Sequence, residues 1–302
     1  MNFERRTFLK LTAVLGAGIV ASPITNTLLG CTTAAKLNVQ NNFGLGLYTL
    51  RDELPKDPKG VLTKVASFGY KEIESYEHDK LGMFWGMSAV EFKKLMDDLG
   101  MKIVSSHCAI HKDLEKKADE AAAIGMRYLV CPSLDGPMGK SEDKMNLDDY
   151  KRAADLLNKA GEICKSKGLR FGYHNHDHTF IPRNGVIPQD ILIQNTDQNT
   201  VDYEMDIYWV VTGGQDPEAW FRKYPGRFKL SHVKDRKKGI PASEREASVN
   251  LGTGSIDFSA ILRTGIANGM THFFVEQERY EGTTPLDAVK TNANYMKNFR
   301  SA

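Results

Sequence analysis

Imidazole and carboxylate side chains that could bind a metal stand at the ends of four predicted β-strands in the second half of the chain. They are the pair His174 and His176, then Asp206, His232 and Glu276. Neighbouring strands of a barrel bring their last residues to one rim, so these groups would converge there. A mixed set of nitrogen and oxygen ligands suits a divalent cation. The pattern therefore predicts a metal enzyme.

The two histidines and the aspartate are unusual for a strand. His174 and His176 are two residues apart, so both side chains would point the same way. One would bind the metal, and the other would contact substrate or act as a base. Asp206 lies in an apolar run, where a carboxylate is costly to bury unless it is paired or metal-bound. A helix cap is the alternative role for Asp206.

The last two strands add a lysine and further acids. His232 and Lys234 share one strand face; His232 is a predicted ligand, and Lys234 would polarise a substrate oxygen or be a solvated strand-end lysine. Glu276 follows the apolar stretch 273–275, where burial without a partner would raise its pKa. That setting suits a metal ligand or a general base, with Glu278 as a second candidate.

Substrate contacts are predicted from both halves of the chain. His107 ends a strand and Glu74 lies within one, so both could reach substrate hydroxyls, although purely structural roles are equally open. Trp209 would wall the pocket or pack in the core.

The first residues have the pattern of an export signal. Arg5-Arg6 precedes an apolar run over 11–24, which is short for a membrane span but typical of a signal peptide. This resembles a twin-arginine signal. Leu-Leu-Gly before Cys31 resembles a lipoprotein cleavage site, so we expect 1–31 to be a signal ending at an acylated Cys31; an ordinary cysteine is the alternative. The expected protein is a periplasmic lipoprotein bound to the membrane through its lipid, with 32–42 as a polar tether.

Strands and helices alternate through residues 43–302, with glycines closing helices just before strands. The predicted strands are 43–50, 70–77, 102–108, 128–133, 169–176, 201–210, 227–235 and 270–278. The predicted helices are 58–68, 89–99, 113–124, 148–167, 188–194, 217–223, 258–268 and 285–300. Ser88 and Glu91 form a predicted capping box. Eight such units predict an α/β fold, a single-domain (β/α)8 TIM barrel.

Composition and short motifs exclude several classes. The net charge is +2 with basic residues spread along the chain, which gives no reason to expect nucleic acid. No G-x-G-x-x-G motif follows the first strand, so a dinucleotide is not expected. The Gly252–Ser255 loop could hold phosphate or be a turn before the Asp257 helix cap. Cys108, Cys131 and Cys164 are read as buried thiols, with a Cys108–Cys131 disulfide as the alternative.

Six motifs in order carry a family resemblance. They are Leu47-Tyr48-Thr49-Leu50-Arg51-Asp52, Tyr173-His174-Asn175-His176-Asp177-His178, Met205-Asp206-Ile207-Tyr208-Trp209-Val210, His232-Val233-Lys234-Asp235, Gly252-Thr253-Gly254-Ser255-Ile256-Asp257-Phe258 and Val275-Glu276-Gln277-Glu278. Together they resemble the sugar phosphate isomerase/epimerase family of xylose-isomerase-like TIM barrels. The resemblance implies one divalent metal ion held by strands five to eight, with His174 at the strand-five position; Mn, Mg, Co, Zn and Fe are not distinguished.

The resemblance also implies the chemistry. Members isomerise, epimerise or dehydrate sugars and polyols, so we expect an isomerase or epimerase that forms an enediolate of a keto-sugar, with Glu276 or His176 as the base. Epimerases usually carry a Glu where this chain has His174. A lyase or hydrolase acting on a keto-glycoside or keto-polyol is therefore the alternative. A non-catalytic sugar-binding lipoprotein is the alternative of another class, and a homo-oligomer is left open.

Overall fold

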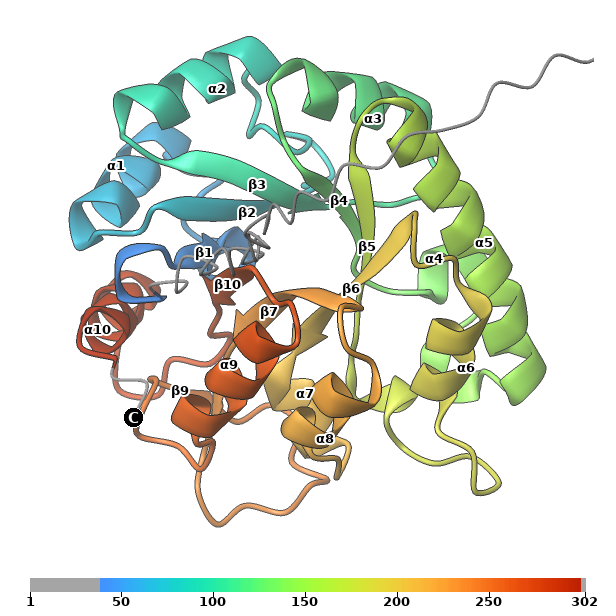
Figure 1. Cartoon of the computed structure of the whole chain (residues 1–302). Helices are drawn as coiled ribbons and strands as arrows, with labels where there is room; N and C mark the ends of the chain where they lie inside the picture. The colour runs from blue at the N-terminus through green and yellow to red at the C-terminus, as the bar shows by residue number, and fades with distance from the viewer. Residues whose placement is uncertain (1–38, 300–302) are drawn as a thin grey trace, which may run out of the picture. The chain divides into compact units, whose positions relative to one another are not determined.

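Eight parallel strands close into a barrel in the computed structural model, which describes residues 39–299 (Figure 1). Around the barrel the strands follow the order β1-β10-β7-β6-β5-β4-β3-β2. Their bounds are β1 Gly44–Gly46, β2 Glu72–Tyr76, β3 Lys102–His107, β4 Tyr128–Cys131, β5 Arg170–His174, β6 Val201–Asp206, β7 Phe228–Val233 and β10 His272–Val275. The predicted TIM barrel is confirmed, because each predicted strand contributes one barrel strand.

Helices surround the barrel, as Figure 1 shows. The longer ones are α1 Pro58–Phe68, α2 Ala89–Asp98, α3 Leu114–Ala123, α5 Leu147–Ser166, α6 Pro188–Asn195, α8 Pro217–Lys223, α9 Phe258–Ala267 and α10 Pro285–Lys297. Shorter elements lie in the loops: η1 Val39–Asn41, η2 Leu47–Leu50, α4 Asp135–Met138, η3 Glu142–Lys144, η4 Asp177–Thr179, α7 Ile207–Thr212, and the two-stranded sheet β8 Asp235–Arg236 with β9 Ser248–Val249. No helix among the described residues is long and apolar enough to cross a bilayer.

The predicted helix boundaries have local causes. The capping box before α2 is confirmed, since the Glu91 amide donates to Ser88 Oγ at 3.2 Å and the Ser88 amide donates to Glu91 Oε2 at 2.9 Å. Gly69 ends α1 with a φ of 99°, a conformation that favours glycine. Such turns return the chain to the start of the next strand.

Most predicted strands are longer than the observed ones, and two of them run into segments that are helical. Residues 47–50 form η2 rather than the end of the first strand, and β6 stops at Asp206, where α7 begins. The cause of the second break is Asp206 itself, because its Oδ1 accepts a hydrogen bond from the Trp209 amide at 3.1 Å. The break leaves Asp206 at the strand end, beside the barrel mouth.

The described chain begins within the predicted tether. The predicted signal 1–31, Cys31 and residues 32–38 lie outside the described residues. Val39 is buried, and the Gln40 side chain donates to the Phe299 carbonyl, so the packed barrel starts before residue 43. Cys108, Cys131 and Cys164 are free and buried, as predicted.

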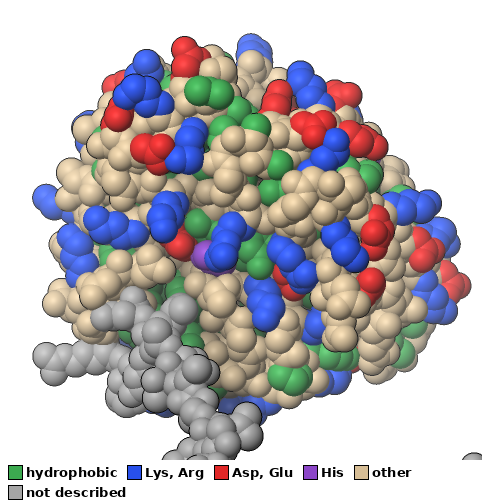
Figure 2. Space-filling view, turned by 45° about the horizontal axis from the view of Figure 1, so that its top comes forward, with side chains coloured by type: hydrophobic (Ala, Val, Ile, Leu, Met, Phe, Trp, Pro, Cys, Tyr) green, Lys and Arg blue, Asp and Glu red, His purple; other side chains and the backbone are tan. Residues whose placement is uncertain are grey.

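The two ends of the barrel differ in charge. Basic residues stand within one position of the first residue of β2, β3, β4, β5 and β7: Lys71, Lys102, Arg127, Arg170, Arg227 and Lys229. We call this the strand-start end. In Figure 1 the βα units run clockwise from α1 to α10. Because βαβ connections are right-handed, this order means that the strand-start end faces the viewer. Figure 2, turned from that view, shows Lys and Arg gathered across the middle of the face.

Candidate metal centre and active site

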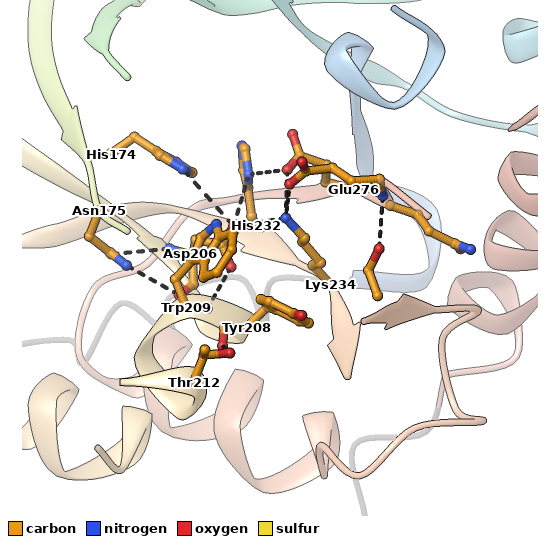
Figure 3. Close-up of polar contacts among 12 residues, drawn as sticks. His174, Asn175, Asp206, Tyr208, Trp209, Thr212, His232, Lys234 and Glu276 are labelled. Atoms are coloured by element: carbon orange, nitrogen blue, oxygen red, sulfur yellow. Dashed lines mark hydrogen bonds and ion pairs between the residues drawn. The ribbon is translucent and has the colours of Figure 1, made fainter. Parts of the chain in front are cut away.

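Three predicted ligands converge at the ends of adjacent strands (Figure 3). Asp206 ends β6 and is in register with His232 on β7, while Glu276 directly follows β10. His232 Nδ1 lies 3.6 Å from Asp206 Oδ2 and 3.4 Å from Glu276 Oε1. One ligand atom from each of the three residues lies within 4.8 Å of the others. This spacing allows one ion to touch all three.

The unsatisfied atoms of this cluster fit a cation. Asp206 Oδ2 and His232 Nδ1 are buried and have no hydrogen-bond partner. Buried polar atoms without partners are costly, and a bound metal ion would satisfy both. His174 Nε2, from the predicted strand-five ligand, lies 4.0 Å from Asp206 Oδ2. Three of the four predicted ligands, Asp206, His232 and Glu276, thus form one group that could hold an ion.

In His232 and His174, the ring nitrogen that does not face the candidate metal position is hydrogen-bonded to a buried glutamate. His232 Nε2 lies 2.7 Å from Glu74 Oε1, and His174 Nδ1 lies 3.1 Å from Glu204 Oε2. His107 Nε2 lies between the two glutamates, 3.1 Å from Glu74 Oε1 and 2.7 Å from Glu204 Oε2. A carboxylate that accepts from one ring nitrogen fixes the tautomer, which leaves the opposite nitrogen free for a metal.

The charges of the cluster favour a cation as well. Burial opposes a charge on His232, but Glu276 and Glu204 outweigh it and raise the pKa of His232 well above its usual value. Burial and the neighbouring Glu74 raise the pKa of Glu204 to about 7. For Glu276, burial is outweighed by His232 and Lys234, which lower its pKa to about 2. The excess of carboxylates that attracts a proton to His232 would equally attract a metal ion.

A second cluster of possible ligands lies deeper in the barrel. His107, His174, Glu204 and His232 could also surround an ion. Their facing nitrogens already have Glu204 or Glu74 as hydrogen-bond partners. The Asp206–His232–Glu276 cluster, with its two unpartnered atoms, is therefore the better candidate.

Lys234 is a buried cation beside the candidate ligands. Its Nζ lies 3.4 Å from Glu276 Oε1 and 3.9 Å from Asp206 Oδ2, and it also bonds Glu278. Burial opposes its charge, but Asp206 and Glu278 keep its pKa above the usual value. Lys234 lines a small cavity of about 30 Å³ together with Trp209 and Arg245.

A larger cavity of about 630 Å³ opens beside the cluster. Its inner wall contains His107, His174, His176, Trp209 and Glu276. Burial lowers the pKa of His176 to about 4, so its imidazole is neutral near pH 7. A neutral imidazole at a cavity wall can accept a proton.

The structure separates the other predicted substrate contacts. His107 and Trp209 line the larger cavity, whereas Lys234 and Glu74 are not among its described lining residues. Glu74 is 2% exposed and bonds His232 and Ser105, so its contacts are those of a positioning residue. Sequence reasoning missed Glu204, although Asp202, Glu204 and Asp206 alternate along β6 and therefore share a face.

The Gly252–Ser255 loop is a turn around a carboxylate. The amides of Gly252 and Gly254 donate to Asp235 Oδ2, both at 2.9 Å, and the Ile256 amide donates to Oδ1 at 3.2 Å. Backbone amides arranged this way commonly bind phosphate. Here Asp235 occupies them, so this loop is not available to a phosphate group.

Comparison with known proteins identifies the family. The family model for the xylose isomerase-like TIM barrel matches residues 62–299, so the chain belongs to this family. It is 29% identical over 167 residues to an inosose dehydratase of Clostridium beijerinckii, an alignment that spans 51% of this chain and 52% of that one. The chain thus matches about half the length of such curated relatives.

Two solved structures are similar over most of the chain. A sugar phosphate isomerase/epimerase from Parabacteroides distasonis ATCC 8503 is 30% identical, with 88% of this chain and 96% of that chain covered and a TM-score of 0.70. The IolI protein with a bound zinc atom is 16% identical, with 85% and 98% covered and a TM-score of 0.69. The second likeness shows the shared fold alone.

Proposed function

We propose that this protein is a metal-dependent lyase of the dehydratase type that removes the proton α to the carbonyl of an unphosphorylated keto-polyol or keto-sugar. The observation that carries the proposal is the convergence of Asp206, His232 and Glu276 with two buried, unpartnered ligand atoms. The inosose dehydratases among the relatives support elimination as the outcome. The backbone amides of Gly252 and Gly254, which could otherwise bind a phosphate, already donate to Asp235, and this favours a substrate without phosphate.

The ligands would be His174, Asp206, His232 and Glu276. A divalent cation held there would act as a Lewis acid on the substrate carbonyl and make the neighbouring C–H bond more acidic. The zinc of IolI supports such an ion, without fixing its identity.

His176 is the proposed base. Its ring lines the cavity and has no hydrogen bond to another described residue, so a ring nitrogen can take the α proton. Trp209, with its ring centroid 5.5 Å from that of His176, orients the imidazole and covers one side of the cavity. His176, once protonated, can return its proton to the departing hydroxyl, so one residue can serve both steps of a dehydration.

Isomerisation or epimerisation is the second candidate. The specific observation in its favour is that a carboxylate, Glu276, and an imidazole, His176, line the same inner wall and could exchange protons with one carbon. The Parabacteroides structure, which is named for that activity, supports it.

The test is to incubate the protein, loaded in turn with Mn²⁺, Mg²⁺, Co²⁺ and Zn²⁺, with inosose and with acyclic ketoses in deuterated water. The α C–H bond is expected to break in either case: dehydration loses that hydrogen and gives a conjugated enone, whereas the second candidate gives an isomeric sugar that carries solvent deuterium. His176→Ala should lower turnover by roughly 100-fold or more, whereas His178→Ala, two residues along, should not. Turnover with complete retention of the α hydrogen would refute both candidates.

We also propose that the chain is exported and anchored through an acylated Cys31. The twin arginines and the Leu-Leu-Gly-Cys run support this. Membrane fractionation of the full-length chain and of Cys31→Ala tests it, and recovery of both as soluble cytoplasmic protein would contradict it.

A further inference from the structure

We propose that the strand-start end of the barrel docks on the membrane surface through anionic phospholipid headgroups, with the mouth of the cavity facing away from the lipid.

The basic residues of this end are neighbours across the barrel. The Lys102 amide donates to the Lys71 carbonyl at 2.9 Å, and the Arg170 amide donates to the Arg127 carbonyl at 2.8 Å. Lys71, Lys102 and Arg127 are exposed, and Arg170 is partly exposed. The side chains of Lys71, Lys102 and Arg127 therefore present charge from three adjacent strands at one surface. Figure 2 shows Lys and Arg gathered on the face that it draws.

Acidic residues at this end are mostly neutralised. Glu72 is buried and lies 2.8 Å from His272, and Asp202 bonds Arg170 through both oxygens. Asp97 and Asp98, at the end of α2, pair with Lys93 and Lys94. Asp197 adds an exposed carboxylate beside β6. The balance at the strand-start end is positive.

This balance is local and not a property of the whole barrel. The whole chain has 40 Lys and Arg against 38 Asp and Glu. Five of these basic residues and one acidic residue fall outside residues 39–299, so the described part has 35 basic against 37 acidic residues. Carboxylates gather instead around the cavity, where Glu77, Asp79, Asp135 and Glu278 line the wall. An anionic surface would attract one end and repel the other, and so orient the barrel.

The path of the chain leads to the same end. The Phe43 carbonyl, just before β1, accepts from the Lys71 amide at 3.1 Å, and Gln40 bonds Phe299 beyond α10. Cys31 precedes Val39 by eight residues, which reach at most about 29 Å when fully extended. If Cys31 is acylated as proposed, the strand-start end stays within that distance of the lipid. The anchor thus supplies proximity and the basic residues supply orientation.

The test measures cosedimentation of the full chain carrying Cys31→Ala with phosphatidylcholine vesicles that contain either none or about 30% phosphatidylglycerol. Each basic residue near an anionic surface contributes about fivefold in binding. A triple variant, Lys71→Glu, Lys102→Glu and Arg127→Glu, should therefore bind the anionic vesicles at least about 10-fold more weakly. The matched control, Lys56→Glu, Lys116→Glu and Lys151→Glu, reverses three exposed lysines of the opposite half and should bind as the parent does.

Residues 1–38 are the same in all three proteins, so a difference between the two triple variants reports the strand-start end alone. Unchanged thermal melting of both variants shows that they are folded. Equal binding by the two variants, or parent binding that does not depend on phosphatidylglycerol or does not weaken in high salt, would overturn the proposal. Tighter binding to duplex DNA than to the anionic vesicles at equal salt would assign the surface to nucleic acid and overturn it too.

Discussion

The two oxygens of Asp206 have different surroundings. Oδ1 caps α7 by accepting from the Trp209 amide, whereas Oδ2 faces His232 without a hydrogen-bond partner. The sequence posed cap and metal ligand as alternatives, and the structure allows both because one carboxylate has two oxygens.

Substitution can separate these two functions. Asp206→Asn keeps a cap acceptor but loses the anionic ligand, so metal content should fall to a small fraction while the metal-free protein keeps its stability. Asp206→Ala should lose the same metal and a further ~1 kcal/mol through the missing cap. Elemental analysis and urea denaturation in chelator measure the two effects. Full metal occupancy in the Asn variant would exclude Asp206 as a ligand.

Glu74 should act on the metal through His232. In Glu74→Gln the amide can still bond the ring, but the charge that supports His232 as a ligand is lost, so metal affinity should fall about 10–100-fold. Isothermal titration of the metal measures it, with Glu162→Gln, an exposed change on α5, as the control. Identical affinity in both variants would leave Glu74 with a structural role only.

At the scale of elements, sequence periodicity predicted the barrel well because each βα unit carries its own signals. Ser88 with Glu91 and Gly69 mark helix ends within a few residues. The ends of the strands at the mouth were harder. Residues 207–210 are apolar and were predicted as the end of a strand, but they lie in α7, which begins at the Asp206 cap. Glu204 was missed because its partner His107 is distant in sequence, and only the fold brings them together.

The loop after β9, which contains Gly252–Ser255, should depend on Asp235. Asp235→Ala leaves the amides of Gly252, Gly254 and Ile256 without their acceptor, at a cost of about 1–3 kcal/mol for each one that water cannot reach. The free amides should then bind phosphate, so millimolar phosphate should raise the melting temperature of this variant but not that of the parent. Equal responses of both proteins to phosphate would contradict the assignment.

Glu142 should make the loop between β4 and α5 sensitive to pH. Its Oε1 accepts from the Leu134 amide at 2.6 Å, Oε2 has no partner, and burial raises its pKa from 4.5 to about 7. Between these values the folded state binds more protons than the unfolded state, so stability contributed by the protonated form is lost as pH rises from about 4.5 to 7.

Glu142→Gln should remove that loss. Relative to the parent, the variant should gain stability across this pH window, by up to about 3 kcal/mol above pH 7. Urea denaturation of the chelated proteins from pH 4 to pH 8 measures the difference. A constant difference across that range would show that the carboxyl group of Glu142 is not the titrating group.

At the scale of the whole molecule, the candidate ligands join distant parts of the barrel. These ligands stand within one residue of the ends of β5, β6, β7 and β10, which are four consecutive strands of the closed sheet: His174, Asp206, His232 and Glu276. An ion bound to all four would stabilise only the folded barrel, because these residues are far apart in the unfolded chain. Stability should therefore report metal binding even when no substrate is known.

The expected size follows from linkage. Metal at 1,000 times its Kd contributes about 4 kcal/mol, and a protein of this size shifts its Tm by roughly 2–4 °C per kcal/mol. Chelation should then lower the Tm by about 8–16 °C, and returning the correct divalent ion should restore it. Asp206→Asn is the matched control, since it keeps the cap and should melt at the same temperature with or without chelator. An unchanged Tm of the parent protein after complete removal of metal would mean that the four residues do not share an ion, and the His232–Glu74 and His174–Glu204 pairs would then be structural contacts of the barrel interior.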